Sequence, residues 1–504
     1  MSDFTKLTDF TPKHQHRAYV NSAIRFHHSF TKEQRLEAAI KAGWNVFQFP
    51  AEMTIGDFLS DSGTTTPTIE QIAASLLGDE AYGKNWSGVL LLEEIKKTCG
   101  IDVGLPSSDA DWKIFLFHQC RPAEYALFTQ IAGNPLKRAW RYIKHWCLLK
   151  FGRNGGRLVI PSNGHFDTTH ANIEKNGIEA LDIVSTEDKK FQGNMDTIKL
   201  AELLDKDPSK IPLVYCTITN NTMAGQPVSL QNISDISYLC KKHKKPFFLD
   251  ACRFAENAWF IKQNEHPELS IQEIIHEMFS LCDGFTISFK KDGLANMGGA
   301  LCIKTNTVLF DEYPNILEDL YDHQIGTEGH DSYGGMSGRD IMIVVEGLKT
   351  VVTEEYLNSR ILQVKAFGDY LVELGIPVVQ PFGGHAVYVD VDKFFEGTTM
   401  RREDFGDVVL SALTLLNGPR VCGLGAFAFG SYDPKTGKDT FPPFNYVRIA
   451  IPRNKYEIED LFYCADCIKN LYDKRDQLPR AVCVYGKEKT LRHFKARFEL
   501  KERK

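Results

Sequence analysis

The stretch ISFKKDGLANMGGALC, residues 287–302, joins two apolar segments through a pair of adjacent lysines. The first segment ends at Lys290 and Lys291, and an Asp-Gly turn follows at 292–293. The second apolar segment then opens with Gly298-Gly299. A solvated lysine pair is usual in a charged helix or loop, whereas this pair stands between two predicted strands. The stretch therefore predicts a strand–turn–strand unit in which the lysines have a specific place.

Outward from this stretch, short apolar segments alternate with helical ones between about 155 and 305. The predicted strands cover 157–162, 211–219, 245–250, 284–289 and 299–304. Segments 229–245 and 271–282 between them have helical spacing. Such alternation is typical of an α/β fold with a mostly parallel sheet. In these sheets, ligands bind at the carboxyl ends of the strands.

The two flanks of this region differ from it. Before it, 31–43 predicts a helix ending at a glycine, and Thr66 with Pro67 predicts the start of another. The apolar face of that second helix would hold Ile69, Ile72, Ala73, Leu76 and Leu77. After about 340, one long helix (339–374), strands at 385–391 and 445–453 and two more helices predict a smaller α+β domain, and we expect the first helix to join it.

The predicted organisation follows from these patterns. Residues 1–20 form an N-terminal arm and 21–59 part of the small domain. Residues 60–335 form the large domain, and 336–504 complete the small domain.

Composition excludes several classes of protein. The chain has 504 residues, a formal net charge of -6 and 12 scattered cysteines. This acidic balance gives no signature of nucleic-acid binding, and no run of about 18 apolar residues predicts a membrane span. The N-terminal residues lack the apolar core of a signal peptide, and scattered thiols fit a reducing compartment. We therefore expect a soluble, cytoplasmic protein with neither nucleic-acid nor membrane partners.

Two other segments have a structural interpretation. The basic, aromatic segment 136–156 predicts a half-buried helix rather than a membrane or nucleic-acid contact. The CADC sequence at 464–467 is a single Cys-x-x-Cys pair at helical spacing, which predicts packing rather than a zinc site.

Two charged residues mark neighbouring strand ends. Asp250 ends the strand at 245–250, Arg253 follows it, and Lys291 comes just after the strand at 284–289. This arrangement suits pyridoxal 5'-phosphate (PLP), because a lysine holds the aldehyde as a Schiff base and a carboxylate keeps the pyridine nitrogen protonated. Taken singly, Asp250 is also compatible with a helix N-cap and Lys291 with a surface lysine.

Eight segments together resemble the tryptophanase and tyrosine phenol-lyase family, and they occur in the family's order between about residue 37 and the C-terminus. They are FLSDSGTTT (58–66), GDEAYG (78–83), TITNNTMAGQPVSL (217–230), FFLDACRFAENAWFIKQ (247–263), ISFKKDGLANMGGALC (287–302), PFGGHAVYVDV (381–391), YVRIAIPR (446–453) and KTLRHFKARF (489–498). The resemblance implies a PLP-dependent β-eliminating lyase of fold type I, with an aspartate aminotransferase-like large domain. It also implies a homotetramer with active sites between subunits.

The resemblance assigns roles to particular positions. Lys291 would hold the cofactor and move the substrate Cα proton, and Tyr82 would be the general acid. The remaining cofactor contacts would come from Asp250, Arg253, Phe166, Gln119, Cys120, Arg121, Ser288 and Lys290. The amino-acid substrate would meet Arg448, Asn221, Ser60, Ser62, Asp167, Leu424, His493 and Phe47. A monovalent cation, K⁺ or NH₄⁺, would be bound by Gly63, Glu80 and Asn296.

Three of these positions bear on the substrate. Phenol-lyases have an arginine where this chain has Leu424, a phenylalanine at His493 and a threonine at Asp167. The resemblance thus favours L-tryptophan, cleaved to indole, pyruvate and ammonia. The three residues are also compatible with core packing, a surface histidine and a helix N-cap. Tyrosine, an S-substituted cysteine or another β-substituted amino acid remain alternative substrates, and a non-catalytic member of the fold is a further alternative.

One position departs from the family pattern. The family has glycine between the glutamine and the arginine of its phosphate loop, whereas this chain has Cys120. A cysteine fits there if the contact is made by the backbone N–H and φ is negative.

Overall fold

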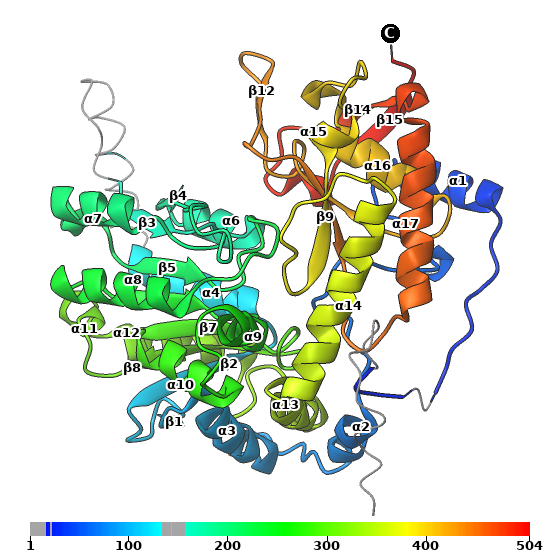
Figure 1. Ribbon diagram of the computed structural model, residues 1–504. Helices are drawn as coiled ribbons and strands as arrows, with labels where there is room; N and C mark the ends of the chain where they lie inside the picture. The colour runs from blue at the N-terminus through cyan, green and yellow to red at the C-terminus, as the bar shows by residue number, and fades with distance from the viewer. Residues whose placement is uncertain (1–16, 21–22, 134–142, 144–156, 504) are drawn as a thin grey trace, which may run out of the picture.

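A six-stranded mixed sheet forms the centre of the larger part of the molecule (Figure 1). The computed structural model describes residues 17–20, 23–133, 143 and 157–503. The strands lie in the order β1 (Val103–Gly104), β2 (Trp112–Phe117), β8 (Gly299–Lys304), β7 (Gly284–Ser288), β6 (Phe247–Asp250) and β5 (Val214–Thr217). Only β8 runs antiparallel to its neighbours. The five predicted strands are confirmed, although β3 (Val159–Ser162) pairs with β4 (Glu179–Asp182) outside this sheet.

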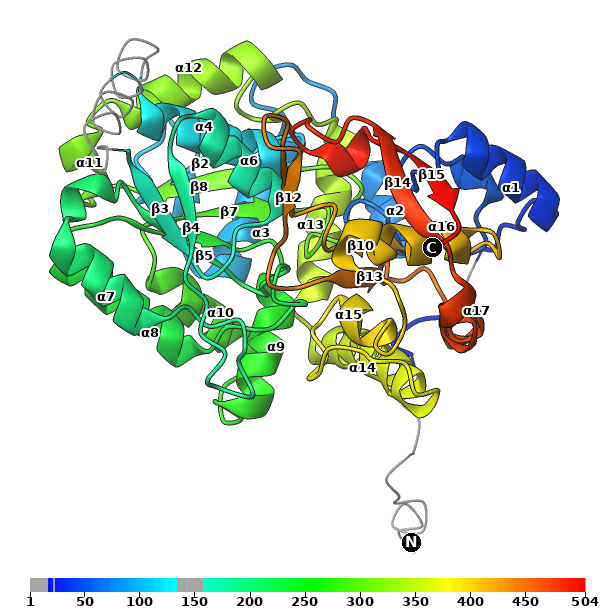
Figure 2. The same ribbon diagram turned by 90° about the horizontal axis from the view of Figure 1, so that it is seen from above.

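Side chains that alternate along β2 enter two different cores. Ile114 and Leu116 belong to one core, and Phe115 and Phe117 to the other, as the twofold period of a strand requires. Helices cover both faces of the sheet (Figure 2). One face packs against α2 (Ile69–Ser75), α3 (Trp86–Cys99), α7 (Thr197–Lys206), α8 (Leu230–Lys242), α9 (Phe254–Asn264), α10 (Ile271–Ser280) and α13 (Gly338–Val351). The other packs against α4 (Cys120–Ala132), α6 (Asp167–Lys175), α11 (Leu309–Glu312) and α12 (Ile316–Glu328).

A second core lies around a three-stranded antiparallel sheet. Its strands are β10 (Cys422–Leu424), β13 (Tyr446–Ala450) and β9 (Ala386–Asp390). The surrounding elements are α14 (Glu354–Glu373), α15 (Val391–Phe394), α16 (Gly406–Leu415), α17 (Ile458–Asp473) and the β14 (Arg480–Tyr485)–β15 (Arg497–Lys501) hairpin. The hairpin of β11 (Ser431–Asp433) and β12 (Lys438–Thr440) extends beside them. Short 3-10 turns are η2 (Ala51–Met53), η3 (Pro208–Lys210), η4 (Arg402–Asp404), η5 (Arg475–Gln477) and η6 (Arg492–Phe494).

The N-terminal helix packs in a small core of its own, in which Ala39 lies with Leu415 of α16. Helix α1 (Lys32–Lys41) starts at a capping box made by Thr31 and Gln34. Gly43, at a positive φ of 64°, ends the turn after the helix. The carbonyl of Gly43 accepts a hydrogen bond of 2.8 Å from the N–H of Phe498 on β15. The turn after α1 thus contacts the C-terminal part of the chain, while the assignment of this helix to the small domain stays a prediction.

Helix α2 departs from its prediction in two respects. Its N-cap is Thr68, which forms a capping box with Gln71, so the predicted start at Thr66 was wrong by two residues. The helix also turns its polar side inward, because the Gln71 side-chain amide donates to the carbonyls of Leu294 and Ile343 at 2.9 Å each. Its apolar side chains are consequently exposed, with Leu76 at 82%.

Two predictions for the C-terminal part also need correction. The predicted helix 339–374 is two helices, α13 and α14, separated at Val352 and Thr353. Of the two helices predicted after β13, only α17 is long, and the β14–β15 hairpin replaces the other. CADC lies on α17, where Cys464 and Cys467 are buried as packing residues. In the described ranges, no group of three or more His, Cys, Asp or Glu side chains is suited to a metal.

The domain boundaries stay a prediction. Buried side chains of α13 belong to the first core although this helix follows the boundary expected at 336, and α14 contributes to both cores. Most of the 1–20 arm and nearly all of segment 136–156 lie outside the described residues. Among the helices that the structure does describe, none has the length and apolar character needed to cross a membrane.

Candidate functional site

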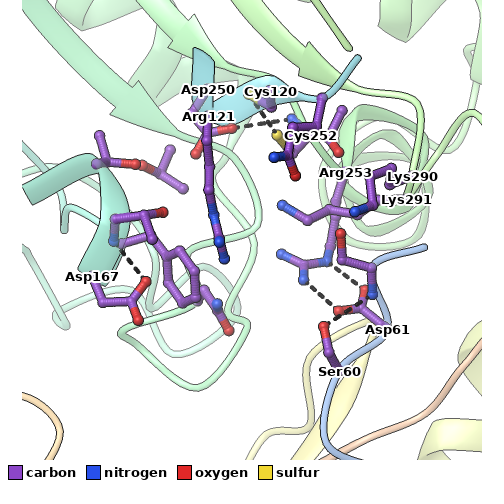
Figure 3. A pocket seen from close by; sticks show the side chains of 18 of the residues that line it. Ser60, Asp61, Cys120, Arg121, Asp167, Asp250, Cys252, Arg253, Lys290 and Lys291 are labelled. Atoms are coloured by element: carbon purple, nitrogen blue, oxygen red, sulfur yellow. Dashed lines mark hydrogen bonds and ion pairs between the residues drawn. The ribbon is translucent and has the colours of Figure 1, made fainter. Parts of the chain in front are cut away.

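A pocket opens where the carboxyl ends of β5, β6 and β7 meet the second core. Figure 3 shows Arg121 reaching into it from one side, with Lys291 and Arg253 on the other. All but three of the predicted site residues line this pocket or contact a residue that does. The predicted lining residues are Phe47, Ser60, Ser62, Gln119, Cys120, Arg121, Phe166, Asp167, Asn221, Asp250, Arg253, Ser288, Lys290, Lys291, Leu424, Arg448 and His493.

Asp250 and Lys291 are brought into one pocket by the parallel pairing of β6 and β7. Asp250 is the last residue of β6, and Lys291 lies in the turn after β7, where its N–H donates to the carbonyl of Ser288 at 3.1 Å. Burial opposes protonation of Lys291, but Cys252 and Asp250 outweigh this effect and raise its pKa. The amine and the carboxylate therefore influence each other within one pocket.

Another set of donors in the pocket suits an anion. Helix α4 starts at Cys120, and its first turn, whose N–H groups have no intrahelical partner, contributes Cys120 and Arg121 to the pocket lining. Burial, Arg121 and Lys291 lower the pKa of Lys290, as expected for cations gathered without a counter-charge. Lys290 also packs on Gly63, where a Cβ would lie 2.5 Å from its Cε. A phosphate group fits this donor set.

A buried network of charges fixes the wall behind Lys291. Asp61 accepts from the Nε and Nη2 of Arg253 at 3.0 and 2.8 Å, and from Arg453 Nη1 at 3.0 Å. Burial opposes ionisation of Asp61, but these arginines hold its pKa well below the usual range. Arg453 also donates to Asp292 Oδ1 at 2.9 Å and to Glu256 Oε1 at 2.7 Å. Because Asp292 follows Lys291 directly, the network restrains the position of the lysine.

A second set of polar groups suits a carboxylate. Arg448 on β13 donates from Nη2 to the carbonyl of Leu59 at 2.9 Å and from Nη1 to Asn221 Oδ1 at 3.4 Å. Its Nε has no hydrogen-bond partner among the described residues although it is buried. Ser60 and Ser62 lie beside it, and the Ser60 hydroxyl accepts from the Ser62 N–H at 3.1 Å. A guanidinium with an unused donor is a suitable partner for a substrate carboxylate.

Two predicted substrate residues form a buried pair. His493 Nε2 lies 3.0 Å from Asp167 Oδ2, and both side chains are more than nine-tenths buried. Burial alone would raise the pKa of Asp167, but His493 outweighs it and lowers the pKa, so the carboxylate stays charged. Phe47 packs edge-on against the His493 ring, with 5.6 Å between centroids. Leu424 on β10 adds an apolar wall.

Four predicted residues do not line this pocket: Gly63, which contacts the lining residue Lys290, and Tyr82, Glu80 and Asn296. The Tyr82 side chain is 74% exposed and packs edge-on against His330 and Tyr333. Glu80 is an ion-pair partner of Arg339 at 3.0 Å. The predicted cation ligands are therefore only partly brought together: Asn296 Nδ2 donates to the carbonyl of Gly63 at 3.0 Å, but Glu80 is engaged elsewhere.

Comparisons with known proteins agree with this geometry. Residues 57–467 match the family model described as beta-eliminating lyase. The chain belongs to the beta-eliminating lyase family. A tryptophanase from Hyphomonas neptunium is 36% identical over 93% of this chain and 95% of its own. A tyrosine phenol-lyase from Pasteurella multocida is 35% identical over 94% of this chain and 95% of its own.

Solved structures show the fold of this lyase. Threonine aldolase of Leishmania major has a TM-score of 0.53 and 16% identity, covering 83% of this chain and 99% of its own. A serine palmitoyltransferase of S. paucimobilis, solved with a bound PLP–myriocin aldimine, has a TM-score of 0.53 and 10% identity over 83% and 87% of the two chains. The fold is PLP fold type I, as the sequence predicts.

Several pocket residues of the lyase were not found from the sequence. Asp61, Glu124, Thr169, Thr217 and Cys252 all line the pocket. Glu124 follows Cys120 by four residues and so shares its helix face, and this spacing could have identified Glu124 as a pocket residue. Asp61 and Cys252 flank predicted residues, but their partners are far away in the sequence.

Glu124 leads to a prediction about pH. Burial and the nearby Asp250 raise the pKa of Glu124 from 4.5 to about 8, and Thr169 Oγ1 donates to its carboxyl at 2.9 Å. Between these two values the folded apoenzyme keeps a proton that the unfolded chain has lost, so stability falls as pH rises. We expect Glu124→Gln, which mimics the neutral acid, to flatten this loss in thermal melts of the apoenzyme between about pH 5 and 8. Parallel Tm–pH curves for the two proteins would contradict the assignment.

Proposed function

We propose that this lyase uses PLP and eliminates the side chain of L-tryptophan to give indole, pyruvate and ammonia. PLP, when bound through its aldehyde to Lys291, supplies an electron sink for the bond-breaking steps at the substrate Cα and Cβ. The anion-binding start of α4 and the Asp250–Lys291 pair support this cofactor. The buried Asp167–His493 pair next to Leu424 is the single observation that carries the choice of tryptophan.

The side chains of the pocket then have distinct tasks. Arg448 binds the substrate carboxylate through its unused Nε–H, with Asn221, Ser60 and Ser62 beside it. Lys291 Nζ accepts the proton from the substrate Cα and is held near it by the Arg453–Asp292 contact. Phe166, the N-cap residue of α6, lines the pocket and would cover one face of the cofactor ring. Arg253 donates to Asp61 from Nε and Nη2, and its remaining nitrogen, Nη1, would donate to the phenolic oxygen of the cofactor ring.

The substrate side of the pocket favours indole over phenol. A charged carboxylate at Asp167 accepts a hydrogen bond from an indole N–H, whereas Leu424 offers no donor or acceptor to a phenol hydroxyl. Sites that bind a substrate polar group strongly discriminate against analogues that lack it. Tyrosine and S-substituted cysteines remain the alternative substrates, because they need the same Lys291, Asp250 and Arg448.

Asp167→Asn tests this assignment. We expect kcat/KM for tryptophan to fall about tenfold or more, because the amide replaces a charged acceptor. The same variant should keep most of its kcat/KM for an S-alkylcysteine, whose leaving group has no N–H. An equal loss on both substrates would show that Asp167 acts on folding or cofactor binding, and would contradict its role in choosing the substrate.

We also propose that the general acid comes from a second subunit of a homotetramer. Tyr82 does not line the pocket of its own chain, so an intramolecular role conflicts with the geometry. The apolar face of α2, just before Tyr82, is exposed at Ile69, Ile72, Leu76 and Leu77. A cluster of exposed apolar side chains of this kind is typical of a protein interface. The same association would supply Glu80 to the Gly63 and Asn296 side of a monovalent cation site.

Subunit mixing distinguishes this arrangement from an intramolecular one. Tyr82→Phe and Lys291→Ala should each be nearly inactive alone. Co-expression with two different affinity tags should give mixed oligomers with restored indole release, because Lys291 of one chain meets Tyr82 of the other. Doubly tagged oligomers that stay inactive would refute a shared site.

A further inference from the structure

Two cysteine side chains meet inside the pocket (Figure 3). The Sγ atom of Cys252 lies 3.6 Å from the Sγ atom of Cys120. Both residues line the pocket and are more than nine-tenths buried. Cys120 opens α4 at the phosphate end, and Cys252 follows Asp250 at the ring end. The thiol pair therefore joins the two parts of the cofactor site.

The backbone on both sides of the pair is held in place. A Cβ on Gly299 would lie 2.5 Å from the backbone nitrogen of Cys120, so β8 packs tightly against the start of α4. Arg253, next to Cys252, is fixed by its paired contacts with Asp61. A disulfide needs about 2.05 Å between sulfurs, so the two sulfurs, which are 3.6 Å apart, must approach each other for the bond to form.

The two sulfurs have different surroundings. The Cys252 side chain is among the causes that raise the pKa of Lys291, so this lysine lies near the Cys252 thiol. The neighbouring Cys252 thiol and burial hold the pKa of Cys120 well above its usual range. Cys120 therefore keeps its proton and is the resolving sulfur, which leaves Cys252 as the attacking one.

We propose that Cys120 and Cys252 are an oxidisable dithiol, a modification site at which a peroxide forms a disulfide that prevents cofactor loading. The Cys252 sulfur attacks hydrogen peroxide, so an S–O bond forms, the O–O bond breaks and the released hydroxide leaves as water with the Cys252 thiol proton. The Cys120 sulfur then attacks this sulfenic sulfur, an S–S bond forms, and the hydroxyl leaves as water with the Cys120 proton. Two thiols lose two electrons, one peroxide gains them, and a dithiol reductant reverses the step.

This inference rests on the proposed PLP function. The disulfide would tie the anion-binding turn at Cys120 to the segment after Asp250 and change the shape of the pocket between them. Binding is reciprocal, so a cofactor that is excluded by the disulfide must also protect the reduced thiols from oxidation.

The test uses the full-length protein, reduced and freed of cofactor, with hydrogen peroxide as the oxidant. Remaining thiols are alkylated and mapped by peptide mass, and PLP loading is followed by visible absorbance before and after treatment. The variants are Cys252→Ser and the matched control Cys422→Ser, a cysteine of the same pocket whose Sγ faces the Gly423 carbonyl. Each variant is compared with its own untreated sample.

We expect wild type and Cys422→Ser to form the Cys120–Cys252 disulfide and to load PLP about tenfold less well, within the usual range for coupled sites. A dithiol should restore loading, pre-bound PLP should slow oxidation, and Cys252→Ser should be insensitive. Absence of the disulfide, unchanged loading after it forms, or equal sensitivity of Cys252→Ser would overturn the inference. Reduced wild type that loads no PLP would overturn the proposed function as well.

Discussion

Lys291→Ala should abolish indole release from tryptophan, with a fall of about 10⁴-fold or more in kcat/KM. The variant removes both the covalent anchor of the cofactor and the base that takes the Cα proton. Neither function has a substitute at that position, because Asp292 Oδ1 is engaged by Arg453 at 2.9 Å and Lys290 faces Gly63. Steady-state kinetics, together with loss of the visible band of the lysine-bound cofactor, measure the effect.

Lys290→Ala is the matched control, since the two lysines are adjacent and both line the pocket. Lys290 lies in the cationic group near Arg121, so we expect its loss to weaken PLP binding about tenfold. At saturating PLP the visible band should remain. A variant at 290 that loses the band, or one at 291 that keeps it, would show that the two roles are assigned to the wrong lysines.

Asp250→Asn should lower kcat by about 10²–10³-fold, the scale expected when one preorganised electrostatic partner is removed. An amide cannot balance a protonated ring nitrogen, so the cofactor would lose much of its capacity to accept electrons. Lys291 should still attach the cofactor. Single-turnover kinetics on fully loaded protein separate this effect from weaker loading.

Asp250→Glu keeps the charge and serves as the control. We expect it to retain more activity than the asparagine variant, although the longer side chain must fit beside Cys252 and Glu124. Equal damage from both substitutions would indicate that the size of the side chain, rather than its charge, is what the site requires at residue 250.

The sequence was most informative where a signal is local. The apolar segments of β6 and β7, with Asp250 and Lys291 at their ends, are sufficient to predict an α/β sheet with a site at its carboxyl edge. The family resemblance then placed Asp167, His493 and Leu424, which do line one pocket.

The predictions failed where the structure depends on contacts between residues that are far apart in the sequence. The inward face of α2 is set by Gln71, whose acceptor Leu294 is 223 residues away. Likewise, Asp61 meets Arg253 across 192 residues, and the Cys120–Cys252 contact spans 132. The spacing of apolar residues along the sequence does not predict such pairs, because these contacts form only when the two cores assemble.

The most direct test of the proposed tryptophan cleavage is a product assay on PLP-loaded protein with tryptophan, tyrosine and an S-alkylcysteine under identical conditions. We expect indole and pyruvate in equal amounts from tryptophan, with the highest kcat/KM of the three substrates. Pyruvate from the S-alkylcysteine without any indole from tryptophan would contradict it.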